Sequence, residues 1–454
     1  MTSDRSTADA GRATRRGFLA LAGTATLAGC NGVGDIGVFS GEDESPEIEG
    51  EALSDALSTV PPTVPERIPI TVEQSQLDET TAAVRDRLEP VPTPFDTTEI
   101  PNGAIRNEIS KMHEEATGAL DDAASAPSPV EAMESLREAR ESARALAAAW
   151  EAIDAGLALA DVRERIPRTR DAIETFRGRW RYVGDEPIRA VLVHGKIEEL
   201  VAFAGRRIGS AGERYGRGLE NPIRVGECAG ALEGARAALA DAEYLYDRYE
   251  SSLADPRPIR SEMTAVGESL VRTLEDRLAA LPDGNLREPS SFVERDIEGT
   301  PVATALGELY RELDYADGLE DEQATGQRAQ VVLSVYETLV SARGFESLRE
   351  RVANGDHATI KSASDVRQIR ESAIEAFEDA LASSGNSNLG QYVLSEEVGT
   401  FEYADRKLGE YDEDRDISAD WLNEELGQYV AVGATARATP ETSAGVADEI
   451  RRGF

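Results

Sequence analysis

The sequence predicts an all-α protein, and three observations support this fold class. From residue 103 onward, apolar residues recur at alternating steps of three and four along almost every segment, which is the spacing of one helix face. No run alternates apolar and polar residues with a period of two, so strands should be nearly absent. Alanine fills many of the apolar positions, which allows helix axes to approach closely. We therefore expect a multi-helix bundle or irregular array of long, Ala-rich antiparallel helices.

Two helices have the clearest periodicity, and the others follow from the same pattern. The first passes through Ala132, Leu136, Ala139, Ala143, Leu146, Trp150, Ile153 and Leu157, and the second through Cys228, Leu232, Ala235, Leu239, Ala242, Tyr246 and Tyr249. Short helices are expected at 51–58 and 76–88. Further helices are expected near 105–123, 167–182, 187–212, 257–281, 302–316, 321–352, 363–384, 389–411, 418–432 and 441–452.

Composition along the chain predicts its organisation. Residues 30–66 are rich in Gly, Pro and acidic side chains, which is typical of a flexible tether. The longest unpatterned stretch inside the helical body is 281–301, so we expect an N-terminal helical part at 67–300 and a C-terminal part at 301–454.

The two parts can be aligned as copies of one three-helix unit. Residues 145–166 align without gaps to 331–352, which pairs Trp150 with Tyr336 and Arg163-Glu164-Arg165 with Arg349-Glu350-Arg351. After an insertion of fifteen residues in the second copy, 171–176 matches 372–377. Ala-, Glu- and Arg-rich helices also resemble one another through composition alone, so kinship and chance both remain open.

Residues 1–29 have the pattern of an export signal. Arg15 and Arg16 precede Phe18 and Leu19, and a diluted apolar run follows that is too short to cross a membrane. The run ends in a lipobox, Leu27-Ala28-Gly29, directly before Cys30, whose thiol can accept a lipid.

These motifs, with the composition of the chain, resemble twin-arginine-exported lipoproteins of haloarchaea. The net charge is −38, and only four of the 48 basic residues are lysines: Lys111, Lys196, Lys361 and Lys407. The resemblance implies a lipid anchor on Cys30 and a location on the outer face of the cytoplasmic membrane. It is limited to residues 14–30 and the composition, and it names no family for the folded part. The acidity also argues against binding nucleic acid, which requires a basic face.

The histidines offer little material for catalysis. His194 precedes Glu198 by one helical turn, as two metal ligands would, but no wider metal motif accompanies them. We interpret His113 and His194 as ordinary half-exposed helix residues, and His357 as a loop residue. We predict no catalytic residue and consider an enzyme improbable, because no nucleophile–base set or phosphate-binding loop occurs.

One acidic segment has the ligand spacing of a calcium-binding loop. Positions 1, 3, 5, 7 and 9 are occupied by Asp412, Asp414, Asp416, Ser418 and Asp420. Ile417 replaces the usual glycine, however, and Asn423 replaces the final glutamate. We therefore favour an acidic linker before a helix that carries Trp421. No cofactor is predicted otherwise.

Two other features favour a structural interpretation. Cys228 lies on an apolar helix face, which predicts a buried, inert thiol. Trp150, Trp180, Tyr244, Tyr246 and Tyr249 could line a ligand groove, but aromatics at helical spacing are more often core residues.

The functional hypothesis is a lipid-anchored interaction or scaffold module at the archaeal cell surface, whose partners are the membrane, through Cys30, and an unidentified envelope protein. The alternative is a solute- or metal-binding lipoprotein that serves a transporter, and an envelope enzyme is the third choice. A broad apolar surface strip would favour the scaffold, and a concave pocket with convergent polar groups would favour the binding protein.

Overall fold

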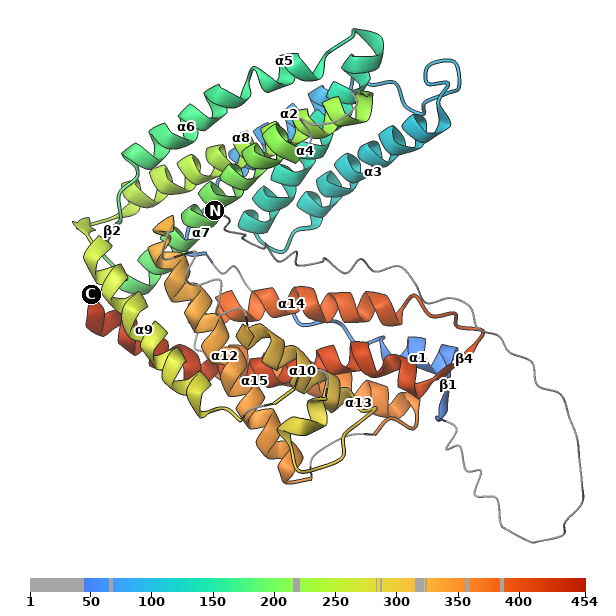
Figure 1. Ribbon diagram of the computed structural model, residues 1–454, viewed down its shortest axis with the longest axis vertical. Helices are drawn as coiled ribbons and strands as arrows, with labels where there is room; N and C mark the ends of the chain where they lie inside the picture. Colours follow the sequence, from blue (N-terminus) through green and yellow to red (C-terminus); the bar gives the residue numbers. More distant parts are fainter. Residues whose placement is uncertain are drawn as a thin grey trace, which may run out of the picture. The chain divides into compact units, whose positions relative to one another are not determined.

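The computed structural model confirms the all-α class (Figure 1). It describes residues 45–64, 68–214, 221–282, 284–285, 288–314, 322, 325–355, 359–383 and 388–454. In these ranges the named strands are short and form two antiparallel pairs. β1 (Glu47–Glu49) pairs with β4 (Asp416–Ser418), and β2 (Val183–Gly184) pairs with β3 (Arg257–Pro258).

The first half of the described chain forms the N-terminal helix group. Its members are α2 (Gln74–Leu88), α3 (Gly103–Ser125), α4 (Pro129–Asp154), α5 (Leu159–Arg163), α6 (Ile166–Arg179), α7 (Pro187–Gly209), the π-helix η1 (Ser210–Arg214) and α8 (Pro222–Ser252). The long helix α8 packs against α4 and α7, and α3 packs against the other side of α4 (Figure 1). Gly226 permits the close contact of α8 with α4, because a Cβ there would lie 2.6 Å from the carbonyl oxygen of Ala145.

The remaining helices form the C-terminal helix group. Its members are α1 (Gly50–Ala56), α9 (Arg260–Ala280), η2 (Pro289–Phe292), α10 (Pro301–Asp314), α12 (Arg328–Ala353), α13 (Ala363–Ser383), α14 (Asn388–Leu408), η4 (Ala419–Leu422) and α15 (Asn423–Gly453). The 31-residue helix α15 packs against α10, α12, α13 and α14. None of the helices in the described ranges is both long and apolar enough to cross a membrane.

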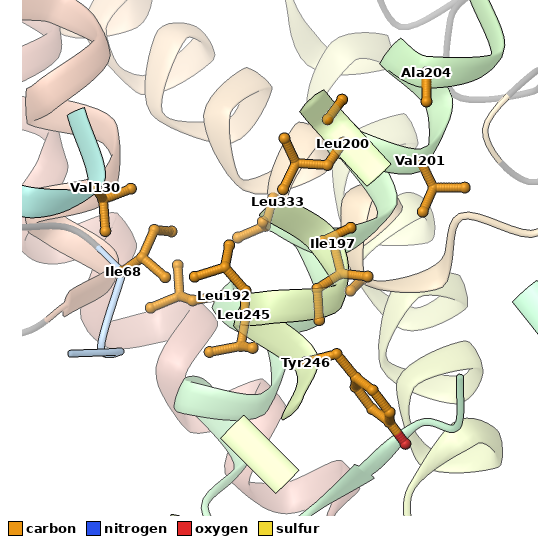
Figure 2. Close-up of a cluster of buried hydrophobic side chains, with 14 of the residues drawn as sticks. Ile68, Val130, Leu192, Ile197, Leu200, Val201, Ala204, Leu245, Tyr246 and Leu333 are labelled. Carbon is orange, nitrogen blue, oxygen red and sulfur yellow. The ribbon is translucent and has the colours of Figure 1, made fainter. Parts of the chain in front are cut away.

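The two helix groups share one hydrophobic core where α7 meets α12. Figure 2 shows Leu192, Ile197 and Leu200 of α7 in a cluster with Leu245 of α8 and Leu333 of α12. All five side chains are at most 2 % exposed. The fold therefore brings α12 of the second group directly onto α7 of the first.

The sequence predicts two helices at 418–432 and 441–452, but the structure has the single helix α15. Pro440 lies inside it and removes one backbone hydrogen bond. The helix continues because residues on both sides of the proline are buried: Tyr429 and Val432 precede it, and Val446 and Ile450 follow it. Tertiary packing outweighs the local cost of the proline.

The predicted tether is too long at its C-terminal end. Residues up to 66 were assigned to it, yet β1 pairs with β4, and α1 packs against α13. Ile48 and Leu53 are only 2 % and 1 % exposed, in a core cluster with residues of α13, α14 and α15. Because acidic residues separate these apolar residues, the composition of the segment did not indicate that Ile48 and Leu53 are buried. The rest of the predicted tether, before residue 45, lies outside the described residues.

The proposed duplication does not pair equivalent residues. Tyr336 is completely buried and donates a hydrogen bond from its hydroxyl to the carbonyl of Leu389, whereas Trp150 is half-buried beside Phe95. Helix α4 ends at Asp154, but α12 continues through the aligned positions to Ala353. Arg163-Glu164-Arg165 consequently falls at the end of α5, not at the end of the first helix. The similarity of the two segments is compositional.

The close contact between α4 and α8 can be tested with a matched pair of glycine substitutions. Gly226→Ala should lower the free energy of unfolding by about 1–3 kcal/mol, because the new methyl group meets the backbone of α4. Gly205→Ala, inside α7, has no atom within 4 Å of the new Cβ and should raise it by about 0.5–1 kcal/mol. Denaturant titration measures both values. Equal effects would contradict the packing described for α4 and α8.

Candidate functional site

An acidic cavity of about 690 Å³ opens where the two helix groups meet. Helices α4 and α7 form one wall, and α10, α12, α14 and α15 form the opposite wall. Seven carboxylates and two basic side chains line this acidic cavity: Glu134, Glu199, Glu312, Glu322, Glu337, Glu396, Glu397, Arg137 and Lys196. Hydroxyl groups of Ser334, Thr338, Ser341, Tyr392 and Thr435 complete the polar lining.

Both basic side chains of the cavity already pair with carboxylates of the N-terminal helix group. The Lys196 ammonium is 6 % exposed and pairs with Glu134 and with Glu199, at 2.8 Å from the latter. The Arg137 guanidinium lies 3.4 Å from the Asp241 carboxylate and over the ring of Phe203. Burial nevertheless raises the pKa of Asp241 to about 6. This wall is therefore close to neutral and has little positive charge left for the opposite wall.

On the opposite wall, the charged groups that act on Glu337 and Glu397 are other carboxyl groups, whereas Glu312 has both Glu308 and Arg311 near it. Glu312 accepts a 2.5 Å hydrogen bond from the Ser341 hydroxyl, and Glu337 accepts one from the Tyr392 hydroxyl. Burial raises the pKa of Glu337 to about 7, and the negative charges of Glu396, Glu322 and Glu312 add to this rise. Burial also raises the pKa of Glu397 well above its ordinary value, again with help from Glu312, Glu396 and Glu337.

The local sequence explains why Glu337 is drawn toward the interior although it is charged. Glu337 occurs in the apolar stretch VVLSVYETLVSA of α12, whose other faces pack against α7, α9 and α15. The helix must be buried to satisfy its apolar residues, so it carries Glu337 inward with them. Glu337 and Glu397 keep some accessible surface, and both line the cavity. Charged groups in such surroundings require protons or counter-cations.

The predicted pair His194 and Glu198 does lie on one face of α7, but it is buried and not half-exposed as expected. His194 is 0 % exposed. Its Nδ1 accepts a hydrogen bond from the indole of Trp180 at 3.1 Å, and its Nε2 donates to the Val183 carbonyl at 2.9 Å. Burial lowers the pKa of His194 to about 4, so the ring is neutral at pH 7. Both ring nitrogens are used within the fold.

Glu198 caps the first turn of α12. Its carboxylate accepts hydrogen bonds from the backbone amides of Arg328 at 2.7 Å, Ala329 at 3.2 Å and Gln330 at 2.6 Å. The Tyr182 hydroxyl donates a fourth, at 2.5 Å. Burial raises the pKa of Glu198 to about 7, although these four donors act in the opposite direction. Because α12 carries Gln330, Ser334 and Glu337, Glu198 positions one wall of the acidic cavity.

The acidic segment 412–423, interpreted from the sequence as a linker before a helix, passes through a turn into β4. Asp416 and Ser418 belong to β4, and the amide of Asp414 donates to the Asp412 carboxylate at 3.1 Å. Asp412, Asp414, Asp416 and Asp420 are exposed. Nowhere in the described ranges do three His, Cys, Asp or Glu side chains form a group that could hold a metal ion.

The other residues singled out in the sequence analysis either pack within the fold, away from the acidic cavity, or lie outside the described residues. Cys228 is completely buried, as predicted, and its thiol donates to the Ala211 carbonyl. Tyr246 and Tyr249 are core residues, and none of the five aromatics lines the acidic cavity. His113 is half-buried on α3. His357 and the signal and lipobox residues 14–30 lie outside the described residues.

Sequence analysis missed the residues of the acidic cavity. Glu337 and Glu397 were not distinguished from the many other glutamates. The available signal was the single carboxylate within VVLSVYETLVSA, where a polar residue interrupts an otherwise apolar helix. The contributions of α4, α7 and α14 could not be found in this way, because they depend on how the helices pack.

Comparison with known families divides the chain at the same junction. Residues 75–255 are similar to a family described as "Domain of unknown function (DUF8262)" and residues 260–448 to one described as "Domain of unknown function (DUF8264)". The predicted boundary at 300 lies inside the second match. Searches of curated proteins and of solved structures found no match. The acidic cavity takes Glu134, Arg137, Lys196 and Glu199 from the first matched region and its other lining residues from the second.

The role of Glu198 can be tested through stability. Glu198→Ala leaves buried amides of α12 without an acceptor and should lower the free energy of unfolding by about 3 kcal/mol. Glu378→Ala removes an exposed carboxylate on α13 and should change it by less than about 0.5 kcal/mol. Urea unfolding of both variants measures the difference. A Glu198→Ala protein as stable as the Glu378→Ala control would show that the cap is dispensable.

Proposed function

We propose that this protein is a lipid-anchored, extracytoplasmic binding protein that takes up an organic cation in the acidic cavity and serves a transporter. The observation that carries the proposal is the wall formed by α10, α12 and α14. There, Glu312, Glu337 and Glu397 lie together, and the charged groups that raise the pKa of Glu337 and Glu397 are carboxylates. An ammonium or guanidinium group placed among them would supply the missing counter-charge.

The size and position of the acidic cavity support a small-molecule ligand. A volume of about 690 Å³ falls within the range of cavities that bind small molecules, roughly 300–1,000 Å³. Such sites occur preferentially at junctions between domains, and this cavity draws on both regions that match a family. The hydroxyls of Ser334, Thr338 and Tyr392 provide polar groups that could orient a bound molecule.

The exposed surface of the protein disfavours the scaffold hypothesis. In the described part of the chain, the exposed large hydrophobic side chains are Val60, Tyr403 and Trp421. Three such residues are too few to form the broad apolar strip that a helical scaffold would present to a protein partner. A concave site with converging polar groups is the feature that favours the binding protein.

Anchoring is proposed from the sequence signal. The twin arginines and the lipobox before Cys30 support export and lipid attachment, and a binding protein held at the membrane would remain beside its transporter. This part of the proposal is independent of the cavity, because it depends only on residues 14–30.

The ligand class can be tested by titrating spermidine and putrescine in molar NaCl. We expect saturable binding to the wild-type protein. Glu337→Gln should weaken it about tenfold, which corresponds to about 1.4 kcal/mol, because one charge-assisted contact is lost. Glu402→Gln removes an exposed carboxylate from α14, the helix that carries Glu397, and should leave affinity unchanged. Isothermal titration calorimetry gives the values. Equal affinities for both variants, or equal binding of a neutral polyol, would refute the cation site.

The proposal also predicts a pH dependence. The folded-state pKa of Glu337, about 7, lies above its ordinary value of 4.5. Its contribution to stability is therefore present below pH 4.5 and is lost as the pH rises through 7. Without ligand, the thermal midpoint should fall between about pH 5 and 8, and Glu337→Gln should flatten this slope. Affinity for spermidine should rise over the same range, because the carboxyls ionise. A pH-independent affinity would contradict the assignment.

A further inference from the structure

Trp421 is an exposed aromatic residue on a firmly held support. Its side chain is 68 % exposed, whereas Ala419 and Leu422 of the same 3-10 turn are 3 % and 0 % exposed. The Tyr411 hydroxyl donates to the Trp421 carbonyl at 3.3 Å, and the Asn423 side chain donates to the Gly299 carbonyl at 2.9 Å. The backbone on both sides is therefore fixed, and the indole is presented to the surroundings without a protein partner in the core clusters.

The turn η4, which carries Trp421, lies beside Ser45 and Pro46, where the described part of the chain begins. β4 precedes the turn and pairs with β1, and the Ala419 amide donates to the Pro46 carbonyl at 2.8 Å. Residues 31–44, fourteen in number, separate Ser45 from Cys30. A fully extended chain reaches at most about 3.3–3.6 Å per residue, so the end of the fold that carries Trp421 stays within about 50 Å of a lipid on Cys30.

We propose that Trp421 docks this end of the fold into the lipid surface, in the headgroup region of the membrane. The inference rests on the lipid anchoring in the proposed function. Tryptophan suits this location because its ring is apolar while its N–H can still reach a polar group. The tether raises the local concentration of membrane around Trp421, so that a single aromatic contact suffices where it would be too weak for a free protein.

The charges around Trp421 make the docking depend on salt. Asp412, Glu413, Asp414 and Asp420 are exposed on the same or the adjoining segment. At about 0.1 M salt the Debye length is roughly 10 Å, so these carboxylates repel anionic headgroups. At 1 M it falls to roughly 3 Å, and the repulsion is largely screened while the apolar contact remains. Docking on an anionic membrane is therefore expected in brine and is suppressed in dilute buffer.

The experiment uses the full-length lipidated protein in vesicles of phosphatidylcholine and phosphatidylglycerol, a fraction of which carries brominated acyl chains. Bromine quenches indole fluorescence only at short range. In molar NaCl the wild-type protein should be quenched, and Trp421→Phe, which retains Trp150 and Trp180, should lose most of that quenching. Lowering the salt to about 0.1 M should reduce it several-fold. Acrylamide, a water-soluble quencher, should reach Trp421 less in vesicles than in detergent.

Flotation of the same vesicles separates the two proposals. Wild-type protein should float and Cys30→Ser should not. Protein that floats, but whose Trp421 is open to acrylamide and untouched by bromine, would overturn the docking and leave the anchor intact. Trp421 shielded from acrylamide without bromine quenching would show that a protein surface covers it, which also overturns the docking. Wild-type protein that fails to float overturns the anchor and the docking together.

Discussion

The carboxylate of Glu198 is the interaction on which the arrangement of this fold depends. It lies on α7, in the N-terminal helix group. It accepts hydrogen bonds from three backbone amides at the start of α12, in the C-terminal helix group. The N-terminus of a helix has backbone amides without acceptors and a partial positive charge. A buried carboxylate placed there accepts hydrogen bonds from the amides and gains a favourable charge interaction. Leu333 then packs one turn further along, in the core shared with α7. The hydrogen bonds of Glu198 therefore fix the start of α12 at the place where its apolar side chains pack against α7.

The position of α12 determines the chemistry of the acidic cavity. Once its first turn is fixed on α7, the next turns direct Ser334 and Glu337 toward Lys196 and Glu199 across the junction. Glu198 is a buried and Glu337 a half-buried carboxyl group, and both have a raised pKa, but their surroundings differ. Glu198 has four hydrogen-bond donors, whereas Glu337 has the Tyr392 hydroxyl and a set of neighbouring carboxylates. The first is satisfied within the fold, and the second has capacity left for a ligand.

The sequence was sufficient for the fold class and for most helices, because apolar spacing reports which face of a helix is buried. It was insufficient where packing decides the outcome. Pro440 indicates a break that the buried neighbours on both sides prevent. The acidic residues around Ile48 conceal a strand, and they conceal the burial of the predicted helix that follows it. The calcium-loop spacing at 412–423, where an acidic linker was favoured, is interrupted in the same way, since Asp416–Ser418 pairs with β1 as a strand. The acidic cavity could not be predicted as a whole, because its residues come from helices far apart in the chain.

The acidity of this protein has different consequences on its surface and in its cavity. With a net charge of −38, carboxylates are plentiful everywhere, and the surface could be expected to compete for any cationic ligand. In concentrated salt, exposed charges are screened over a few ångströms and attract a cation only weakly. Partly buried charges are screened much less. If the acidic cavity takes up a cation as proposed, Glu337 and Glu397, which are half-buried, would keep an attraction that exposed carboxylates lose, and concentrated salt would favour the cavity over the surface.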